Sequence, residues 1–270
     1  MTNRTVYSAG IRLKKKFGQH FLRDQGIVNA MLDRVPLGAT TSVFEVGPGD
    51  GFLTRSLLQM PIARLWSFEI DTQWAKHLNA TIHDKRFTLY EQNFLDVDPA
   101  LFASHAPWVI MANLPYQITF PILRFLQRNR QYLTEGVIMI QEEVAQKLVK
   151  TRGRGYGFPS LFFNHYFVIE LLAKVPPTAF LPPPKVESRL VYLKTKHDVK
   201  VIPNEEEFWN FIKRCFAQPR RTLRNNLQQT HFDLSKLSEE TLALRAQQLS
   251  LDELIALWTT LNAGREKTAL

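Results

Sequence analysis

Residues 45–51 read Glu45-Val46-Gly47-Pro48-Gly49-Asp50-Gly51, and this stretch decides the fold. It overlaps the end of the apolar run Ser42–Val46, which is typical of a buried strand. It precedes Phe52–Gln59, where apolar residues recur at helical spacing. Glycines between a strand and a helix let the main chain turn sharply and approach a ligand closely. The stretch therefore predicts the first strand–loop–helix unit of an α/β sheet, with a ligand at the loop.

A carboxylate follows Gly49 at a distance of twenty residues, near the end of the second apolar run, Leu65–Ile70. Glu69 can accept hydrogen bonds from both hydroxyls of a ribose at this position. The loop lacks the G-x-G-x-x-G spacing of dinucleotide sites, and no Walker lysine follows it. The pattern favours the nucleoside of S-adenosylmethionine over a pyrophosphate, and a structural turn with a surface glutamate is the alternative.

The middle of the chain alternates short apolar runs with helical patterns, which predicts a parallel sheet with helices on both faces. A stretch with five prolines between residues 176 and 184 cannot be helical, and it joins two strands that pair at the far edge. The sheet then has about seven strands. The expected strands are Ser42–Val46, Leu65–Ile70, Phe87–Glu91, Trp108–Ala112, Val137–Ile140, Phe167–Leu172 and Arg189–Lys194.

The composition changes near Pro203. No convincing strand follows Glu205, and aromatic residues such as Phe208 and Phe211 recur at helical spacing. Ser250 and Glu253 form a capping box for a last helix. We expect three parts: a basic N-terminal segment (1–25), an α/β domain (26–202) and a small helical domain (203–265).

The net charge is +9 with a pI near 9.7, and the basic residues gather in three clusters. Such clusters suit a polyanion that touches several surfaces, and a merely solvated basic surface is the alternative. The clusters do not lie on one amphipathic helix, which argues against binding to an acidic membrane. The clusters are Arg4, Arg12, Lys14, Lys15, Lys16 and Arg23; Lys147, Lys150, Arg152 and Arg154; and Lys213, Arg214, Arg220, Arg221 and Arg224.

A single cysteine, Cys215, excludes an internal disulfide and a multi-cysteine metal site. The histidines show no metal-ligand spacing, so we expect no metal. The N-terminus is polar and basic, unlike a signal peptide, and no apolar run reaches the roughly 18 residues of a membrane span. We expect a soluble cytoplasmic monomer.

The tetrad Asn113-Leu114-Pro115-Tyr116 follows the apolar run Trp108–Ala112, so it lies where a buried strand opens into its loop. An exocyclic amine of a nucleobase is a poor nucleophile, because its lone pair is delocalised into the ring. The Asn113 side-chain carbonyl and the Leu114 main-chain carbonyl could grip its N–H groups, and Tyr116 offers a flat face for stacking. An ordinary strand-to-helix turn is the alternative.

With these elements placed, nearly the whole chain resembles the ribosomal RNA adenine dimethyltransferases, and more closely their small-subunit branch. The segments that carry the resemblance follow the order and the residue pattern of the family's motifs. They are Phe17-Gly18-Gln19-His20-Phe21-Leu22, Glu45 to Gly51, Phe68-Glu69-Ile70-Asp71, Asn113 to Tyr116, Ala179-Phe180-Leu181-Pro182-Pro183-Pro184-Lys185-Val186, and Arg220-Arg221-Thr222-Leu223-Arg224-Asn225-Asn226-Leu227.

The resemblance implies a seven-stranded Rossmann-like class I methyltransferase sheet with a C-terminal helical domain that binds RNA. It implies S-adenosylmethionine as cofactor, immature small ribosomal subunits as partner, and dimethylation of two adjacent adenines at N6. The implied catalytic residues are Asn113, Leu114, Tyr116 and Phe180, with Tyr116 and Phe180 stacking on both faces of the base. Cofactor contacts are implied at His20, Leu22, Gly47, Gly49, Glu69, Asn93 and Asn113. We expect RNA contacts at Lys14, Lys15, Arg152, Arg220, Arg221 and Arg224.

Two positions depart from the family pattern. His20 stands where the family usually has an asparagine, and Asn93 stands where an aspartate usually accepts from the adenine amine of the cofactor. The Asn93 carbonyl can accept without charge, so we expect weaker cofactor binding there. Asp96 is a possible substitute.

Three other functions stay open. A DNA adenine-N6 methyltransferase would share the tetrad but usually carries a DNA-recognition insert, which we do not find. A large-subunit ribosomal RNA methyltransferase of the antibiotic-resistance type usually lacks the Arg220–Leu227 segment. A non-catalytic factor in ribosome assembly or transcription would be favoured by loss of Asn113 or Glu69, and both are present.

Overall fold

The computed structural model describes residues 6–14 and 18–263. The chain divides into two compact units, Met1–Ala145 with Phe167–Thr195, and Gln146–Tyr166 with Lys196–Leu270. The sequence indicated one boundary near residue 203, whereas the second unit also takes in residues 146–166. Packing inside that unit explains the difference, because the rings of Phe162 and Trp209 lie 4.9 Å apart.

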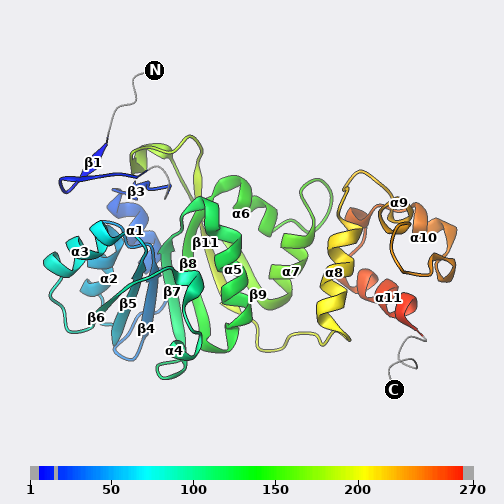
Figure 1. Cartoon of the computed structure of the whole chain (residues 1–270), viewed down its shortest axis with the longest axis horizontal. Coiled ribbons are helices and arrows are strands. Elements are labelled where there is room, and N and C mark those ends of the chain that lie inside the picture. Colours follow the sequence, from blue (N-terminus) through cyan, green and yellow to red (C-terminus); the bar gives the residue numbers. More distant parts are fainter. Residues whose placement is uncertain (1–5, 15–17, 264–270) are drawn as a thin grey trace. The chain divides into compact units, whose positions relative to one another are not determined.

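The first unit is built on a seven-stranded sheet with the order β6-β5-β4-β7-β8-β11-β9 (Figure 1). Strands β4 to β8 run parallel, whereas β11 runs antiparallel to both β8 and β9. The predicted α/β sheet, closed by a strand pair at its far edge, is confirmed. The strands are β4 (Ser42–Val46), β5 (Arg64–Glu69), β6 (Phe87–Glu91), β7 (Trp108–Asn113), β8 (Leu133–Gln141), β9 (Phe167–Val175) and β11 (Ser188–Thr195).

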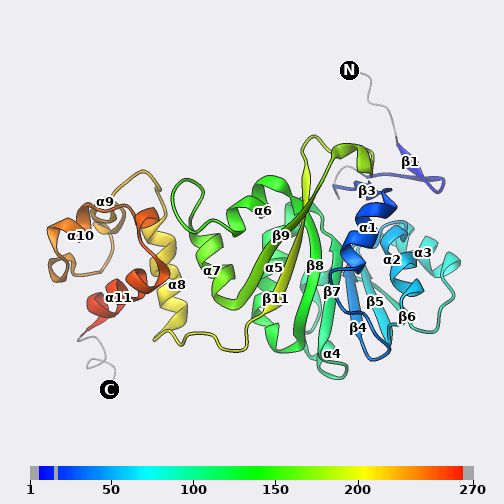
Figure 2. The same cartoon turned by 180° about the vertical axis from the view of Figure 1, so that it is seen from behind.

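The central strands bury both faces, because successive side chains of a strand point to opposite sides. In β4, Val43 joins an aliphatic core, while the neighbouring Phe44 packs 5.2 Å from Phe102 in an aromatic cluster. Helix α1 lies in front of the sheet in Figure 2 and α5 in Figure 1. The helices around the sheet are α1 (Gln25–Leu32), α2 (Phe52–Gln59), α3 (Thr72–Thr81), α4 (Ala100–Ala103) and α5 (Thr119–Arg128), and α6 (Glu142–Leu148) follows β8.

Two short strand pairs lie outside the main sheet. Strand β1 (Tyr7–Ser8) pairs with β2 (Ile11–Arg12), and β3 (Phe21–Leu22) pairs with β10 (Phe180–Leu181). The proline-rich stretch before β10 contains one 3₁₀ turn, Pro177–Ala179, so the prediction that it cannot be helical was wrong at this point. Proline is tolerated in a first helical turn because the N–H it lacks has no partner there.

The second unit is helical, and the described part of it contains no strand. Its last helix begins with the predicted capping box. The Glu253 side chain accepts from the Ser250 N–H at 2.7 Å, and the Glu253 N–H donates to the Ser250 hydroxyl at 3.3 Å. The helices are α7 (Phe158–Tyr166), α8 (Glu205–Cys215), α9 (Leu223–Leu227), α10 (Glu239–Ala243) and α11 (Leu251–Asn262). Across the described residues, no helix is both long and apolar enough to span a membrane.

Candidate active site

A cavity of about 230 Å³ opens at the carboxyl edge of the parallel strands. This is where open α/β sheets bind ligands, because the loops after neighbouring strands meet there. Five stretches that are distant in sequence share its wall. The wall residues are Gly18, Gln19, His20, Phe21, Val46, Gly47, Gly49, Phe68, Glu69, Ile70, Gln92, Asn93, Phe94, Leu95, Asn113, Leu114, Pro115, Tyr116, Gln117 and Ile118.

The glycine loop closes tightly against the N-terminal segment. Gly49 has a φ of 58°, and a Cβ added to it would lie 2.6 Å from Cε1 of Phe21. A side chain at this position would meet both the strain of the left-handed region and a clash with that ring. Glycine is therefore required here, as the sequence predicted, and the loop backbone forms part of the cavity wall.

Glu69 is buried at the cavity and held by the main chain. Its carboxylate accepts from the Gly49 N–H at 3.1 Å and from the Asp71 N–H at 2.8 Å. Burial raises the pKa of this carboxyl, and the two N–H groups oppose the shift. Each oxygen of a carboxylate has a second lone pair, so Glu69 can still accept from a ligand. Next to it, Ile70 is 52% exposed and offers an apolar face to the same cavity.

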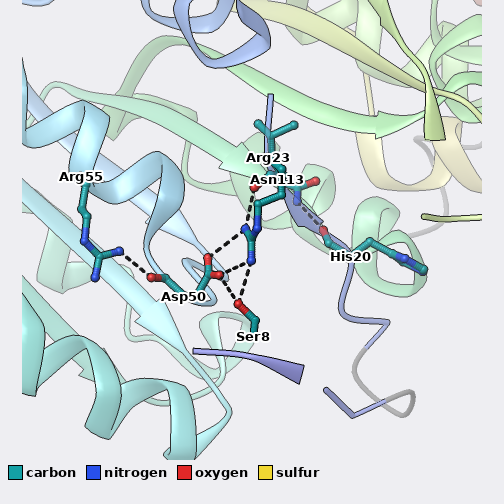
Figure 3. A network of polar contacts seen from close by, with 7 residues as sticks. Ser8, His20, Arg23, Asp50, Arg55 and Asn113 are labelled. Carbon is teal, nitrogen blue, oxygen red and sulfur yellow. Dashed lines mark hydrogen bonds and ion pairs between the residues drawn. The ribbon is translucent and has the colours of Figure 1, made fainter. Parts of the chain in front are cut away.

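A polar network ties the N-terminal segment to the glycine loop (Figure 3). The Arg23 guanidinium pairs with the Asp50 carboxylate and donates to the Ser8 hydroxyl at 2.8 Å. The Ser8 hydroxyl donates to the same carboxylate at 2.7 Å, and Arg55 donates to the Asp50 main-chain carbonyl at 2.6 Å. Sequence reasoning missed this network, because single polar residues in three separate segments give no local signal.

A second attachment lies on the other side of the N-terminal segment. The Asp71 carboxylate accepts from the Lys14 ammonium at 2.7 Å and from the Gln19 side-chain amide at 3.1 Å. The sequence predicted that Lys14 contacts RNA, whereas its ammonium is here paired with Asp71. The other predicted contact in this segment, Lys15, lies outside the described residues. Gly18 to Phe21 are thus held along the cavity wall from both ends.

Asn113 is the last residue of β7, and its side-chain amide donates to the His20 main-chain carbonyl at 3.0 Å. A carbonyl oxygen only accepts, so the NH₂ group of the amide must face His20. The amide oxygen is therefore presented away from His20. The following residue, Leu114, is buried and donates its N–H to the Met139 carbonyl at 3.1 Å. The N-terminal segment therefore fixes the orientation of the Asn113 amide.

Tyr116 faces His20 across the wall. Its hydroxyl lies 2.6 Å from the Ser188 hydroxyl, and burial raises the pKa of the phenol, so it stays neutral at physiological pH. The His20 imidazole lies 6.0 Å from the Tyr116 ring, centroid to centroid, with 22° between the planes. Its Nδ1 donates to the Pro182 carbonyl at 2.8 Å. The described geometry thus gives His20 contacts with the tetrad and with the proline-rich stretch.

Two predicted site residues do not reach the cavity. Leu22 is 3% exposed and Phe180 is 4% exposed; they pair across β3 and β10, and both belong to the aliphatic core. Neither side chain lines the cavity in this structure, so the roles of Leu22 as a cofactor contact and of Phe180 as a stacking face stay predictions. The reason is hydrophobic burial, which draws both side chains into the core instead of the cavity.

Asn93 lines the cavity but its amide is engaged locally. The side-chain oxygen accepts from the Leu95 N–H at 3.2 Å, and the side-chain NH₂ donates to Asp96 at 3.0 Å. The first contact caps the 3₁₀ turn Phe94–Asp96, and the second ties Asn93 to the last residue of that turn. Asp96 is not part of the cavity wall, so it does not substitute for Asn93 there.

Most of the other basic residues predicted to contact RNA lie on the surface of the helical unit. Arg152, Arg220 and Arg221 are exposed, whereas Arg224 forms an ion pair with Glu239. Sequence reasoning gave no role to Asn226. Its amide donates to the Cys215 carbonyl at 2.9 Å and accepts from the Gln218 N–H at 3.1 Å. The turn that carries Arg220 and Arg221 is thereby fixed to the end of α8.

Known proteins resemble this chain over most of its length. A family described as Ribosomal RNA adenine dimethylase matches residues 10–256. Two relatives are each named Ribosomal RNA small subunit methyltransferase A and are each 35% identical to this chain. The relative from Mycoplasma mobile aligns over 92% of this chain and 98% of its own. The relative from Chlorobium phaeobacteroides aligns over 93% of this chain and 94% of its own.

Solved structures agree at the level of the fold. A dimethyladenosine transferase from Plasmodium falciparum superposes with a TM-score of 0.76 at 21% identity, covering 89% of this chain and 97% of its own. The 23S rRNA methyltransferase ErmE superposes with a TM-score of 0.68 at 22% identity, and the match covers 90% of this chain and 99% of ErmE. The chain therefore has the Rossmann-like class I methyltransferase fold that the sequence predicted.

Proposed function

Because the chain belongs to the ribosomal RNA adenine dimethylase family, we propose that it transfers methyl groups from S-adenosylmethionine to N6 of adenines in small-subunit ribosomal RNA. Two adjacent adenines of the immature subunit, each methylated twice, are the proposed acceptors. The observation that carries this proposal is one cavity wall shared by the glycine loop, Glu69 and the tetrad Asn113–Tyr116. A large-subunit substrate is not favoured, because the two relatives that are 35% identical carry small-subunit names, whereas ErmE, at 22% identity, shares the fold alone.

The cofactor would lie along the glycine loop. Glu69 would hold the ribose hydroxyls, and Gly47 and Gly49 would let the main chain approach closely. His20 and Asn93 line the same wall and are proposed to contact the cofactor there. When bound, S-adenosylmethionine supplies a methyl group on a sulfonium sulfur, and the neutral thioether that remains after transfer is an excellent leaving group.

The protein's part in the reaction is to position and activate the acceptor amine. The Asn113 side-chain oxygen and the Leu114 carbonyl would accept its N–H groups, which localises the nitrogen lone pair for in-line attack. Tyr116, held by Ser188, would stack on the base after it leaves its helix. A neutral asparagine also tolerates a monomethylated amine, which has only one N–H left for the second transfer.

The helical unit would contribute binding to the RNA backbone. Arg220 and Arg221 are exposed on a turn that Asn226 fixes, and Arg152 is exposed in the same unit. Guanidinium groups bind phosphate without reading sequence, so these residues would orient the subunit while the cavity selects the base.

Labelled S-adenosylmethionine tests the proposal directly. The wild-type protein should label N6 of adenines in undermethylated small subunits and should leave large subunits and naked DNA unlabelled. The Asn113→Ala variant should lose the label while it still binds the small subunit. Labelled DNA or large subunits would overturn the substrate, and full activity of Asn113→Ala would overturn the role of the tetrad.

A further inference from the structure

The helical unit holds a cavity of its own (the helical-unit cavity), about 680 Å³ in volume, which has no part in the proposed reaction. Residues of α8, of α11 and of the segment 229–232, which follows α9, line it. Its volume falls within the roughly 300–1,000 Å³ that is typical of small-ligand sites. The cavity therefore has room for one nucleotide.

The buried part of its wall is aromatic. The Phe211 and Trp258 rings lie 5.5 Å apart, centroid to centroid, and the Phe232 ring meets Phe211 edge-on at 5.4 Å. His231 is exposed, and its imidazole lies 4.3 Å from the Phe232 ring. Rings in mutual contact hold one another in place, so the cavity presents a preformed apolar wall to a flat ligand ring.

Polar side chains of α8 give the cavity two chemically different ends. Glu207, Asn210 and Arg214 are spaced three and four residues apart, so they share one face of the helix. Seven residues of α-helix rise about 10 Å, so Glu207 and Arg214 lie about two turns apart. Lys213 is at the same end as Arg214, and its ammonium is 3.3 Å from the Asn210 side-chain oxygen. The cavity therefore offers cations at one end and a hydrogen-bond acceptor at the other.

A nucleotide carries groups that match this order. Its phosphate pairs with cations, its base is a flat ring, and its amino or hydroxyl groups donate to a carboxylate. The cationic end also continues into the proposed RNA contacts, because Ala217 lines the cavity and Arg220 and Arg221 follow it within four residues. Bases of a double helix are stacked on one another, so only an unpaired nucleotide can place its ring against the wall.

We propose that the helical-unit cavity binds one unpaired nucleotide of the ribosomal RNA, with its base against His231 and the aromatic wall and its phosphate at Arg214. This inference rests on the proposed function, since it names a further contact with the same RNA. It gives the helical unit a means to distinguish unpaired from paired RNA. Phosphate contacts such as those of Arg220 and Arg221 position the RNA and do not provide that distinction.

A short fluorescent oligouridylate, single-stranded, is the probe, and fluorescence anisotropy with the full chain measures its Kd. Uracil has no exocyclic amine, so the tetrad has no amine to grip. His231→Ala removes the exposed ring, His231→Phe restores one, and Arg214→Ala removes the cation. The matched controls are His197→Ala and Arg245→Ala, because both residues are exposed in the same unit and lie outside the cavity wall. Thermal melting checks folding.

The proposal predicts that His231→Ala raises the Kd for the oligouridylate about fivefold or more, as for loss of one stacked base, and that His231→Phe stays within about threefold of the wild type. Arg214→Ala should lower the slope of log Kd against log salt by roughly 0.7, as for one phosphate of a single strand. The Kd for a duplex, which binds through its phosphates, should change less than about twofold in His231→Ala.

Three results would overturn the proposal: no binding of the probe by the wild type, an unchanged Kd in His231→Ala, or an equal loss in the controls or for the duplex. Failure of the wild type to methylate small subunits would instead refute the proposed function, because the binding assay does not depend on methyl transfer.

Discussion

The side-chain amide of Asn113 donates to the main-chain carbonyl of His20 at 3.0 Å, although 93 residues separate the two in sequence. The amide at the end of β7 has one orientation because of this bond, and its oxygen is directed away from the N-terminal segment. The residue proposed to activate the amine is thus oriented by backbone, which no side-chain substitution at residue 20 removes.

Replacing Asn113 by Asp tests this orientation. The variant keeps an oxygen for the amine but sets a second acceptor against the His20 carbonyl, so the carboxylate must turn or move away. A displacement of about 1 Å costs on the order of 100-fold in rate, and loss of the hydrogen bond costs about 1 kcal/mol of stability. Rates on undermethylated small subunits and the free energy of unfolding measure the two effects. Wild-type values for both would show that the amide orientation is immaterial.

Replacing Gly49 by Ala should disable the glycine loop. The new Cβ would lie 2.6 Å from Phe21 at a φ of 58°, so the loop or the ring must shift, at a cost of about 1–3 kcal/mol. We expect a weaker Kd for S-adenosylmethionine together with lower stability. Gly38→Ala is the matched control, because nothing lies within 4 Å of its added Cβ and its φ is not positive. Equal behaviour of the two variants would contradict the close packing of Phe21 on the loop.

Glu45 should make stability depend on pH. It is fully buried at the start of the glycine loop and accepts from the Thr54 and Ser67 hydroxyls at 2.7 and 2.9 Å. Burial raises the pKa of its carboxyl from 4.5 to about 7. Between these values the folded protein keeps a proton that the unfolded chain has lost. The stabilisation is therefore complete below pH 4.5 and is lost as the pH rises through about 7.

The Glu45→Gln variant removes this titration while its side-chain oxygen can still accept from both hydroxyls. The wild type should lose on the order of 3 kcal/mol relative to the variant between pH 4.5 and pH 7.5. Denaturant unfolding across this range measures the difference, with Glu91→Gln, on an exposed residue, as control. Parallel curves for wild type and Glu45→Gln would contradict the raised pKa.

Arginines of the helical unit should contribute unequally to RNA binding. Arg220 and Arg221 are exposed, whereas the charge of Arg224 is partly neutralised by Glu239. Substitution of Arg220 or Arg221 by Ala should lower the slope of log Kd against log salt by about one, as expected for one lost phosphate contact. Arg224→Ala should change it less. Titration of small subunits at several salt concentrations checks this, and a larger effect at Arg224 would reverse the assignment.

The sequence predicted two of the parallel strands closely, the buried β4 and the partly exposed edge strand β6. The bounds of β4 and β6 match to the residue. Strand β8 was predicted as Val137–Ile140 but runs from Leu133 to Gln141. Gly136 interrupts the apolar pattern because a side chain there would lie 2.1 Å from the Ile110 carbonyl oxygen. The predicted strand began late because the packing of the neighbouring strand demands a residue with no side chain at position 136.

Local sequence pattern predicted the candidate site where its residues follow strands, and the family resemblance added His20. Gly49, Glu69 and Asn113 lie at strand ends, and parallel order brings such ends to one edge. The network of Arg23 with Asp50 and the burial of Phe180 depend on how separate segments pack. No local pattern records these contacts, so they required coordinates.

The N-terminal segment makes contacts that are extremely non-local. Gln19 reaches Asp71 across 52 residues of sequence, and His20 reaches Pro182 across 162. Contacts of this kind carry a high loop-closure entropy until the sheet between them has formed. During synthesis this segment leaves the ribosome first, yet its partners are made much later. The part of the chain that is synthesised earliest is thus the part that completes the active site last.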